Sequence, residues 1–179
     1  LIGDEAIETS PVLERLEDQA SESTVFAFSQ RGRTFLGATP ERLVSLRGRE
    51  FRTVAMAGSA ERDADPAVDA RLAAELLASD KEHEEHAVVV EALRDAMTPL
   101  AERLDVSPRP GVLRLRHVQH LVTPLSGRLR APASVIELAG RLHPSPAVAG
   151  APRELALELI AMEERLERGW FAGPVGWAD

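Results

Sequence analysis

The 179-residue sequence predicts an α+β domain, and three observations support this prediction. Short runs rich in aromatic and β-branched residues dominate the segment 23–57. Apolar residues at helical spacing dominate much of the chain after residue 65. Hydrophobic residues make up 44% of the chain and charged residues 28%, which is typical of a globular domain with its own core. Strand runs and helix runs that occupy separate parts of a chain favour α+β over alternating α/β.

The N-terminal third is predicted to contain one helix and four strands. Leu13 and Leu16 lie at helical spacing within a short helix over 11–20. The four strands are predicted over 23–29, 34–38, 42–46 and 51–57. Turns between strands are predicted at Arg31-Gly32 and Arg47-Gly48.

The remainder of the chain is predicted to be mainly helical. A helix over 66–78 begins with Pro66, which suits a first helical turn. A longer helix over 80–104 follows, with an apolar stripe that includes Val89 and Leu93. The turn residues after it lead to a strand, and then come a helix, a rigid loop, a helix and the start of a strand. These elements are predicted over 112–122, 135–142, 143–152, 153–165 and 170–177.

Composition and charge exclude several classes of protein. The chain has no cysteine, so it has neither disulfides nor a thiolate metal site. The net charge of −8 disfavours nucleic-acid binding, because the field of the protein repels phosphate backbones. No apolar run reaches membrane-spanning length and no signal-peptide pattern opens the chain. We therefore expect a cytoplasmic protein that contacts no membrane, with a monomer as the working expectation for its oligomeric state.

Glu41 is a candidate general acid in the segment Thr39-Pro40-Glu41, between two predicted strands. Pro40 stiffens the turn, so Glu41 is held at a strand edge. A carboxylate in this position can act as a general acid if burial raises its pKa toward the working pH. The alternative is a turn glutamate in solvent.

Glu82 and Glu85 are candidate metal ligands at the start of the helix predicted over 80–104. They are three residues apart and therefore share a helix face. Two carboxylates that converge on one point suit a hard cation such as Mg²⁺. The alternative is a solvated, charged helix start. A zinc site is disfavoured, because His83 and His86 are three residues apart rather than four.

His120 and the loop 143–152 are weaker candidates. Alternation along the predicted strand places Val118 and His120 on one face and His117 on the other. A histidine in such a position is either a hydrogen-bonded core residue or a site residue. Three prolines make the loop rigid, so it is either a pocket wall or a plain connection.

Taken together and in this order, these segments resemble the chorismate-binding enzymes, a family that includes isochorismate, anthranilate, aminodeoxychorismate and salicylate synthases. The matching segments are FLGATPERLV (35–44), AMAGSAERDAD (55–65), LLASDKEHEEHAVVV (76–90), VQHLVTPLSG (118–127), LHPSPAVAGAP (142–152) and FAGPVGWAD (171–179). The resemblance implies part of the anthranilate synthase component I-like fold (also called the ADC synthase fold), in which antiparallel sheets are flanked by helices. It favours isochorismate synthase within the family.

The resemblance also implies roles for individual residues. Glu41 matches the general acid that acts on the departing C4 hydroxyl of chorismate. Glu85 matches a glutamate of a Mg²⁺ site, and Glu82 matches its acidic neighbour. Gly58 and Ser59 match the backbone segment that contacts the substrate.

Three further positions match the substrate pocket. His120 matches a histidine that lines it, and Ala147 and Val148 match residues of its wall. Ala147 matches the position that separates the subfamilies: enzymes that add ammonia usually carry threonine or serine there, whereas isochorismate synthases, which add water at C2, usually carry alanine. The resemblance therefore implies Mg²⁺-dependent conversion of chorismate to isochorismate, for a siderophore, menaquinone or salicylate pathway.

The chain departs from the family pattern in two ways. The family's base is a lysine in a strand before the segment of Glu41, whereas Lys81, the only lysine here, lies elsewhere. The family also has a later segment with an arginine for the substrate and further metal glutamates. Residues 1–179 are thus expected to form a partial chorismate-binding domain that is inactive alone. The alternatives are another chorismate-using enzyme and a non-catalytic domain that retains the fold.

Overall fold

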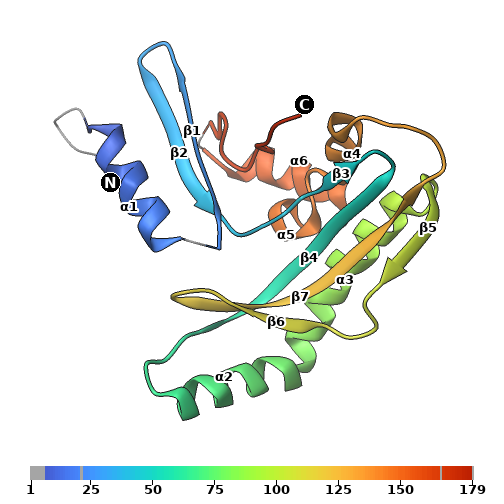
Figure 1. Ribbon diagram of the computed structural model, residues 1–179, viewed down its shortest axis with the longest axis horizontal. Coiled ribbons are helices and arrows are strands. Elements are labelled where there is room, and N and C mark those ends of the chain that lie inside the picture. The colour runs from blue at the N-terminus through green and yellow to red at the C-terminus, as the bar shows by residue number, and fades with distance from the viewer. Residues whose placement is uncertain (1–6, 21, 166, 179) are drawn as a thin grey trace. The chain divides into compact units, whose positions relative to one another are not determined.

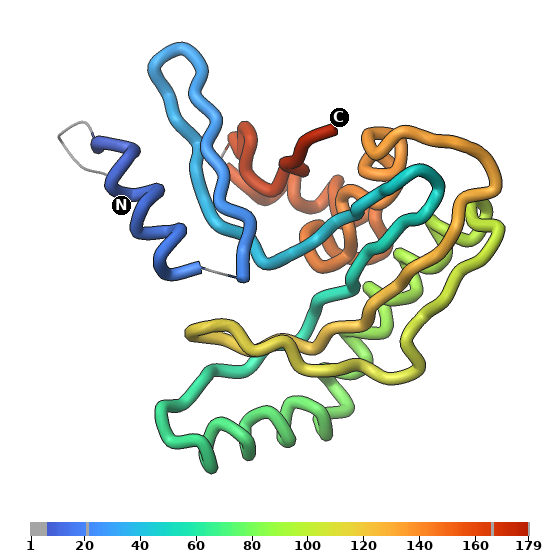
Figure 2. Tube along the Cα trace, in the orientation of Figure 1, coloured from blue at the N-terminus to red at the C-terminus, as the bar shows by residue number. Residues whose placement is uncertain are grey.

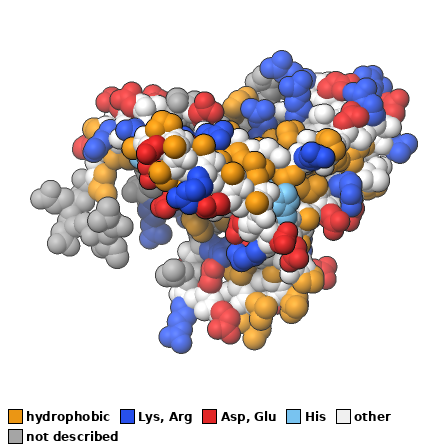
Figure 3. Space-filling model, turned by 90° about the horizontal axis from the view of Figure 1, so that it is seen from below, with side chains coloured by type: hydrophobic (Ala, Val, Ile, Leu, Met, Phe, Trp, Pro, Cys, Tyr) orange, Lys and Arg blue, Asp and Glu red, His pale blue; other side chains and the backbone are white. Residues whose placement is uncertain are grey.

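The computed structural model describes residues 7–20, 22–165 and 167–178. It divides into two compact units, residues 1–41 and 42–179 (Figures 1 and 2). Each unit combines helices with antiparallel strands, so the predicted α+β class is confirmed. No helix among the described residues is long and apolar enough to cross a membrane. On the face displayed in Figure 3, acidic and basic side chains are interspersed with apolar ones.

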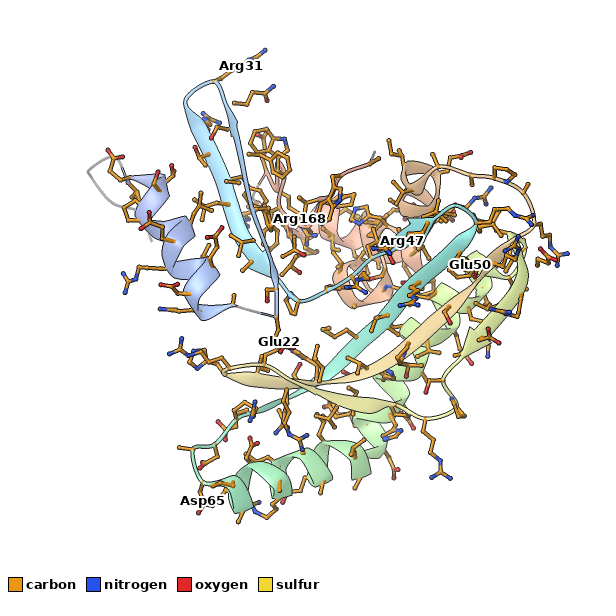
Figure 4. The ribbon with its side chains drawn as sticks, in the orientation of Figure 1. Glu22, Arg31, Arg47, Glu50, Asp65 and Arg168 are labelled. Atoms are coloured by element: carbon orange, nitrogen blue, oxygen red, sulfur yellow. The ribbon has the colours of Figure 1, made fainter. Side chains whose placement is uncertain are left out.

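The first unit consists of a helix and a hairpin. Helix α1 (Thr9–Gln19) packs against the hairpin of β1 (Thr24–Gln30) and β2 (Arg33–Thr39). Arg31 and Gly32 both have positive φ, 51° and 75°, as a two-residue type I′ turn requires. Arg31 marks the tip of this hairpin in Figure 4. The helix, both strands and the turn were predicted from the sequence and are confirmed, with ends that differ by one or two residues.

A five-stranded antiparallel sheet organises the second unit, in the order β3-β4-β7-β5 with β6 also paired to β7. Its strands are β3 (Ser45–Arg47), β4 (Glu50–Glu61), β5 (Ala101–Val106), β6 (Gly111–Arg114) and β7 (Val118–Leu129). The long strands β4 and β7 pair from Glu50↔Arg128 to Glu61↔Val118 and form its centre. On the other edge of β4, its first residues pair with β3. On the other edge of β7, both β5 and β6 pair with it.

Two helices follow β4 and lead to β5. Asp65 caps α2 (Pro66–Ala78) by accepting a hydrogen bond from Ala67 N at 2.8 Å, and Figure 4 shows it at the start of this helix. Ser79 caps α3 (Asp80–Met97), which lies across the sheet (Figure 1). The bounds predicted for α2 are confirmed.

The core lies between α3 and one face of the sheet. Helix α3 contributes a stripe at helical spacing, and β4 and β7 contribute alternate residues, as a half-buried strand requires. The buried members are Phe51, Ala55, Val89, Leu93, Met97, Ala101, Leu125, Leu129, Leu138 and Leu142. Burying each large side chain contributes about 1.5–3 kcal/mol. This cluster therefore holds α3 against the sheet.

Three shorter helices complete the second unit. Helix α4 (Val135–Leu142) begins with a capping box, in which Ser134 and Glu137 each accept from the other's backbone N–H. Its predicted bounds are confirmed. Helix α5 (Pro146–Ala149) lies in the loop predicted over 143–152, and α6 (Arg153–Glu163) follows it.

Two predicted elements in the middle of the chain are wrong in extent. The helix predicted over 80–104 ends at Met97, because Pro99 lacks the N–H that would continue it, and Ala101–Val106 is strand β5. The strand predicted over 112–122 is a hairpin, β6 and β7, with 115–117 between its strands.

Strand β7 continues through Pro124, a residue that normally marks the end of a strand. Strand β5 ends opposite Leu125 and β6 begins opposite Val122, so Pro124 lies at the break between the two partner strands. The Pro124 carbonyl accepts a hydrogen bond from Ser107 N at 3.1 Å. Proline has no backbone N–H, and the position of this missing donor lies at the break. The neighbouring strands thus make the proline tolerable.

Two other predicted strands are wrong in part or whole. The strand predicted over 42–46 is limited to Ser45–Arg47, which pairs with Glu50 to Arg52 of β4. The aromatic run 170–177 forms a turn followed by irregular chain, with no strand partner among the described residues.

Candidate active site

A β-bulge in β4 is the local feature around which the candidate site is built. The register of β4 with β7 shifts between Met56 and Ser59, and Gly58 lies in this interval with φ +81°. A methyl group at Gly58 would lie 3.0 Å from Oε2 of Glu82 and 3.3 Å from Cδ1 of Leu121. Glycine is required here both for its backbone conformation and for the close approach of the Glu82 carboxylate.

Ser59 and His120 form a hydrogen-bonded pair beside the bulge. They are register partners across β4 and β7, and Ser59 Oγ lies 2.8 Å from His120 Nδ1. Burial lowers the pKa of His120, and a hydrogen bond with the Gly58 backbone partly offsets this effect. The imidazole is therefore predominantly neutral at pH 7 and able to donate or accept a hydrogen bond.

Glu82 and Glu85 lie on the first turns of α3 and share a lysine. Lys81 Nζ is 3.2 Å from Glu82 Oε1 and 3.1 Å from Glu85 Oε1. Hydrogen bonds to Glu85 and Glu82 raise the pKa of Lys81, so this amine stays protonated. The Glu82 side chain is 22% exposed and that of Glu85 57% exposed, so Glu82 is the member that packs against the bulge.

This pair of carboxylates fits a hard cation in donor type but supplies few ligands. Both donors are oxygens, as Mg²⁺ prefers, and they already hold one ammonium group between them. Within the described part of the chain, no group of three or more His, Asp or Glu side chains is arranged to bind a metal. Glu82 and Glu85 could thus hold Mg²⁺ only with water or substrate oxygens as additional ligands.

His86 is a site residue that the sequence analysis did not select. Its ring is buried, with Nδ1 3.1 Å from Ala57 O and Nε2 2.7 Å from Thr123 Oγ1. Burial lowers its pKa. The sequence signal that could have identified His86 is its spacing. It lies three residues before Val89 and so continues the apolar stripe of Val89 and Leu93 toward the helix start.

Glu41 is the last residue of the first unit. It is half-buried, and this burial raises the pKa of its carboxyl group. Its backbone N–H donates to Thr39 Oγ1 at 3.3 Å, which holds the turn around Pro40. The solvent-exposed alternative is thus disfavoured by burial, while the role of Glu41 as an acid remains a prediction.

Ala147 and Val148 lie on α5, and the structure does not place them with the bulge residues. Helix α5 packs against α3 and α6, and residues of the α5 region and of the second half of α3 line a groove of about 240 Å³. The groove is lined by Ala92, Leu93, Ala96, Arg141, Leu142, Pro144, Pro146, Gly150, Ala151 and Arg153. Ala92 is ten residues after Glu82, about 15 Å along the helix. The structure therefore brings Glu82 against Gly58 and pairs Ser59 with His120 across the two strands that carry the bulge. Glu85 lies next to Glu82 on α3, and both pair with Lys81.

Comparison with known proteins provides close relatives along almost the whole chain. A salicylate biosynthesis isochorismate synthase from Pseudomonas aeruginosa is 45% identical over 173 residues, which cover 97% of this chain and 36% of that protein. The isochorismate synthase MenF of Bacillus subtilis is 39% identical over 98% of this chain and 37% of its own length. The chain thus spans less than half the length of these curated relatives.

Solved structures share the fold. An isochorismate synthase from Bacillus anthracis, DhbC, described as putative and 2,3-dihydroxybenzoate-specific, superposes with a TM-score of 0.87 at 39% identity, over 92% of this chain and 46% of that one. Anthranilate synthase component I from Streptococcus pneumoniae superposes with a TM-score of 0.82 at 24% identity, over 95% of this chain and 38% of that one, which shows the fold alone. The family model described as chorismate binding enzyme matches residues 1–179, and this chain belongs to that family.

Proposed function

We propose that this chain forms the acid-and-metal part of the active site of an isochorismate synthase. The observation that carries the proposal is the β4 bulge, where Glu82 lies against Gly58 and the next residue, Ser59, pairs with His120. These are four of the positions that the resemblance assigns to substrate and metal. The names of the relatives at 36–45% identity support the same activity.

Substrate binding in this proposal depends on local groups, because chorismate is a dianion and the chain has a net charge of −8. Glu82 and Glu85 would hold Mg²⁺, which when bound would neutralise a carboxylate of the substrate and fix its orientation. The Gly58-Ser59 backbone and the neutral His120 would supply uncharged hydrogen bonds beside it.

The proposed reaction exchanges one hydroxyl group for another. A base takes a proton from water as its oxygen forms a bond to C2, both ring double bonds shift by one position, and the C4–O bond breaks. Glu41 donates a proton to the departing C4 hydroxyl, which leaves as water, so substrate and product are isomers. The raised pKa of Glu41 keeps this proton available closer to neutral pH.

Lys81 does not serve as the base in this proposal. It is paired with two carboxylates that hold it protonated, and a protonated amine cannot accept a proton. We propose that the base belongs to the part of the relatives' length that this chain does not span. The small side chain of Ala147 favours water over ammonia as the nucleophile.

Product identification tests the proposal. The protein at its full natural length is incubated with chorismate and Mg²⁺, with and without ammonium, and the products are separated and analysed by mass spectrometry. We expect isochorismate, of the same mass as chorismate, in both reactions. A nitrogen-containing product that depends on ammonium would contradict water as the nucleophile, and unchanged chorismate would contradict the enzyme activity.

Metal binding is tested separately by thermal melting. If Glu82 and Glu85 hold Mg²⁺, added Mg²⁺ raises the melting temperature of the full-length protein, and Glu82→Gln reduces this increase. The absence of any Mg²⁺-dependent change would favour a non-catalytic domain that retains the fold.

A further inference from the structure

The buried imidazole of His86 joins three elements at the bulge. His86 belongs to α3 and directly follows Glu85, and its residue is 3% exposed. It contacts Ala57 of β4, which precedes Gly58, and Thr123 of β7, which is also 3% exposed. None of these three residues has a role in the proposed binding of substrate or metal.

The directions of the two hydrogen bonds follow from the chemistry of the partners. The Ala57 carbonyl can only accept, so His86 Nδ1 carries the hydrogen and donates it. For the neutral ring, Nε2 is then unprotonated and accepts from the Thr123 hydroxyl at 2.7 Å. A single tautomer thus satisfies both ring nitrogens in a buried place, where an unpaired polar group would destabilise the fold.

The bond to Ala57 lies where the sheet lacks its regular pairing. The β4–β7 ladder pairs Met56 with Val122 and resumes at Ser59, so Ala57 lies in the interval that the bulge disrupts. Bulges leave backbone groups without ladder partners. His86 supplies the partner from α3, and the Glu82 carboxylate lies over the adjacent Gly58 from the same helix.

We propose that His86 is a positioning residue that fixes the bulge at Ala57 and thereby places the Glu82 carboxylate over Gly58. The Mg²⁺ and chorismate measurements that test this inference rest on the proposed function. The measurement of the bulge itself does not. His86 itself touches neither metal nor substrate in this assignment. It acts through the backbone of β4 and through the distance between β4 and the start of α3.

A matched pair of substitutions separates hydrogen bonding from packing. His86→Asn and His86→Leu introduce side chains of similar size, but only the amide can donate to the Ala57 carbonyl. Val89→Ala serves as the packing control, because Val89 is 4% exposed on the same stripe of α3 and has no polar side-chain atom. Thr123→Val removes the second hydrogen bond while keeping the side-chain shape.

The first measurement is hydrogen–deuterium exchange of the segment 55–61 in the full-length protein, compared with exchange in the core of α3. We expect His86→Leu to accelerate exchange in 55–61 by about tenfold relative to the α3 core, and Thr123→Val by about fivefold. His86→Asn should restore most of the protection. Val89→Ala should accelerate exchange in the segment 55–61 and in the α3 core by similar factors.

The second measurement is the Mg²⁺ dissociation constant by calorimetry, with kcat at saturating Mg²⁺. We expect His86→Leu to weaken Mg²⁺ binding about tenfold, because Glu82 is then less firmly positioned, and to change kcat at saturating Mg²⁺ less. His86→Asn should lie within about threefold of wild type. Glu82→Gln is the reference for direct loss of a ligand.

The outcomes separate the inference from the proposed function. If His86→Leu leaves the relative exchange of 55–61 within twofold of wild type, the inference is wrong, whatever the activity. If His86→Leu does not fold, Thr123→Val decides the question by the same criterion. If wild type neither binds Mg²⁺ nor converts chorismate, the proposed function fails, and the exchange measurement still decides the role of His86.

Discussion

Two glutamates one turn apart on α3 have different surroundings. Glu82 is mostly covered and lies against Gly58, whereas Glu85 is largely exposed. Lys81 pairs with both, but exposed ion pairs of this kind contribute little to stability because water screens them. Their pairing with Lys81 therefore adds little to the stability of the fold.

Replacing Glu41 by glutamine should separate function from stability. Burial raises the folded-state pKa of Glu41, so ionisation destabilises the fold increasingly as pH rises through that pKa. Glu41→Gln removes this cost. We expect a melting temperature that matches wild type in acid and exceeds it at pH 8, together with a loss of kcat of about 10²-fold or more in the full-length protein. Unchanged kcat would contradict the role of Glu41 as the acid.

At the scale of elements, a carboxylate anchors the start of α2. Asp69 accepts two hydrogen bonds from Arg62, Nε at 2.7 Å and Nη2 at 2.9 Å, and Arg62 also donates to the Leu115 carbonyl. The Arg62 hydrogen bonds hold the pKa of Asp69 below its usual value. The bidentate pair thus links α2 to the segment between β6 and β7.

Asp69→Asn should lower stability in a pH-dependent way. A lowered folded-state pKa contributes stability above the ordinary pKa of aspartate, about 3.9, and this contribution disappears as pH falls through the folded value. We expect the variant to melt a few degrees below wild type at pH 7, with a smaller difference near pH 3. A constant difference across this range would show that packing, not charge, is responsible.

Two glycines in the same sheet should respond differently to substitution. A methyl group at Gly127 of β7 would overlap the Arg103 carbonyl oxygen and lie 2.7 Å from Phe51 Cζ, whereas at Gly111 of β6 it would meet no atom within 4 Å. We expect Gly127→Ala to destabilise the protein by about 3 kcal/mol or more, because the backbone of β5 must shift. Gly111→Ala should change the unfolding free energy by less than about 0.5 kcal/mol. Denaturant unfolding of both variants measures the contrast.

At the scale of the whole molecule, the 179-residue chain should not convert chorismate by itself. Its only lysine is held protonated by two carboxylates, and its relatives are more than twice as long as the region they share with it. We expect no product above background with chorismate and Mg²⁺ after prolonged incubation. Activity of the purified chain would show that the base lies within these residues.

The sequence predicted the fold class, the first hairpin and the bounds of α2 and α4, because these depend on local signals. Arg31-Gly32 suits a type I′ turn, Pro66 suits a first helical turn, and Ser134 caps α4. Strand β5 and the second half of β7 were missed, because their strand character depends on pairing. Pro124 is compatible with β7 only where β5 ends and β6 begins.

In the candidate site, too, some features were predicted from the sequence and others depend on the tertiary structure. The residue types and their order along the chain were enough to select Glu41, the Glu82/Glu85 pair and His120, since a family resemblance is a property of sequence. That Ser59 meets His120 follows from the β4–β7 register, which a single bulge shifts. That His86 joins α3 to Ala57 and Thr123 follows from packing across the sheet. Local chemistry is encoded residue by residue, whereas contacts between distant segments exist only once the core has formed.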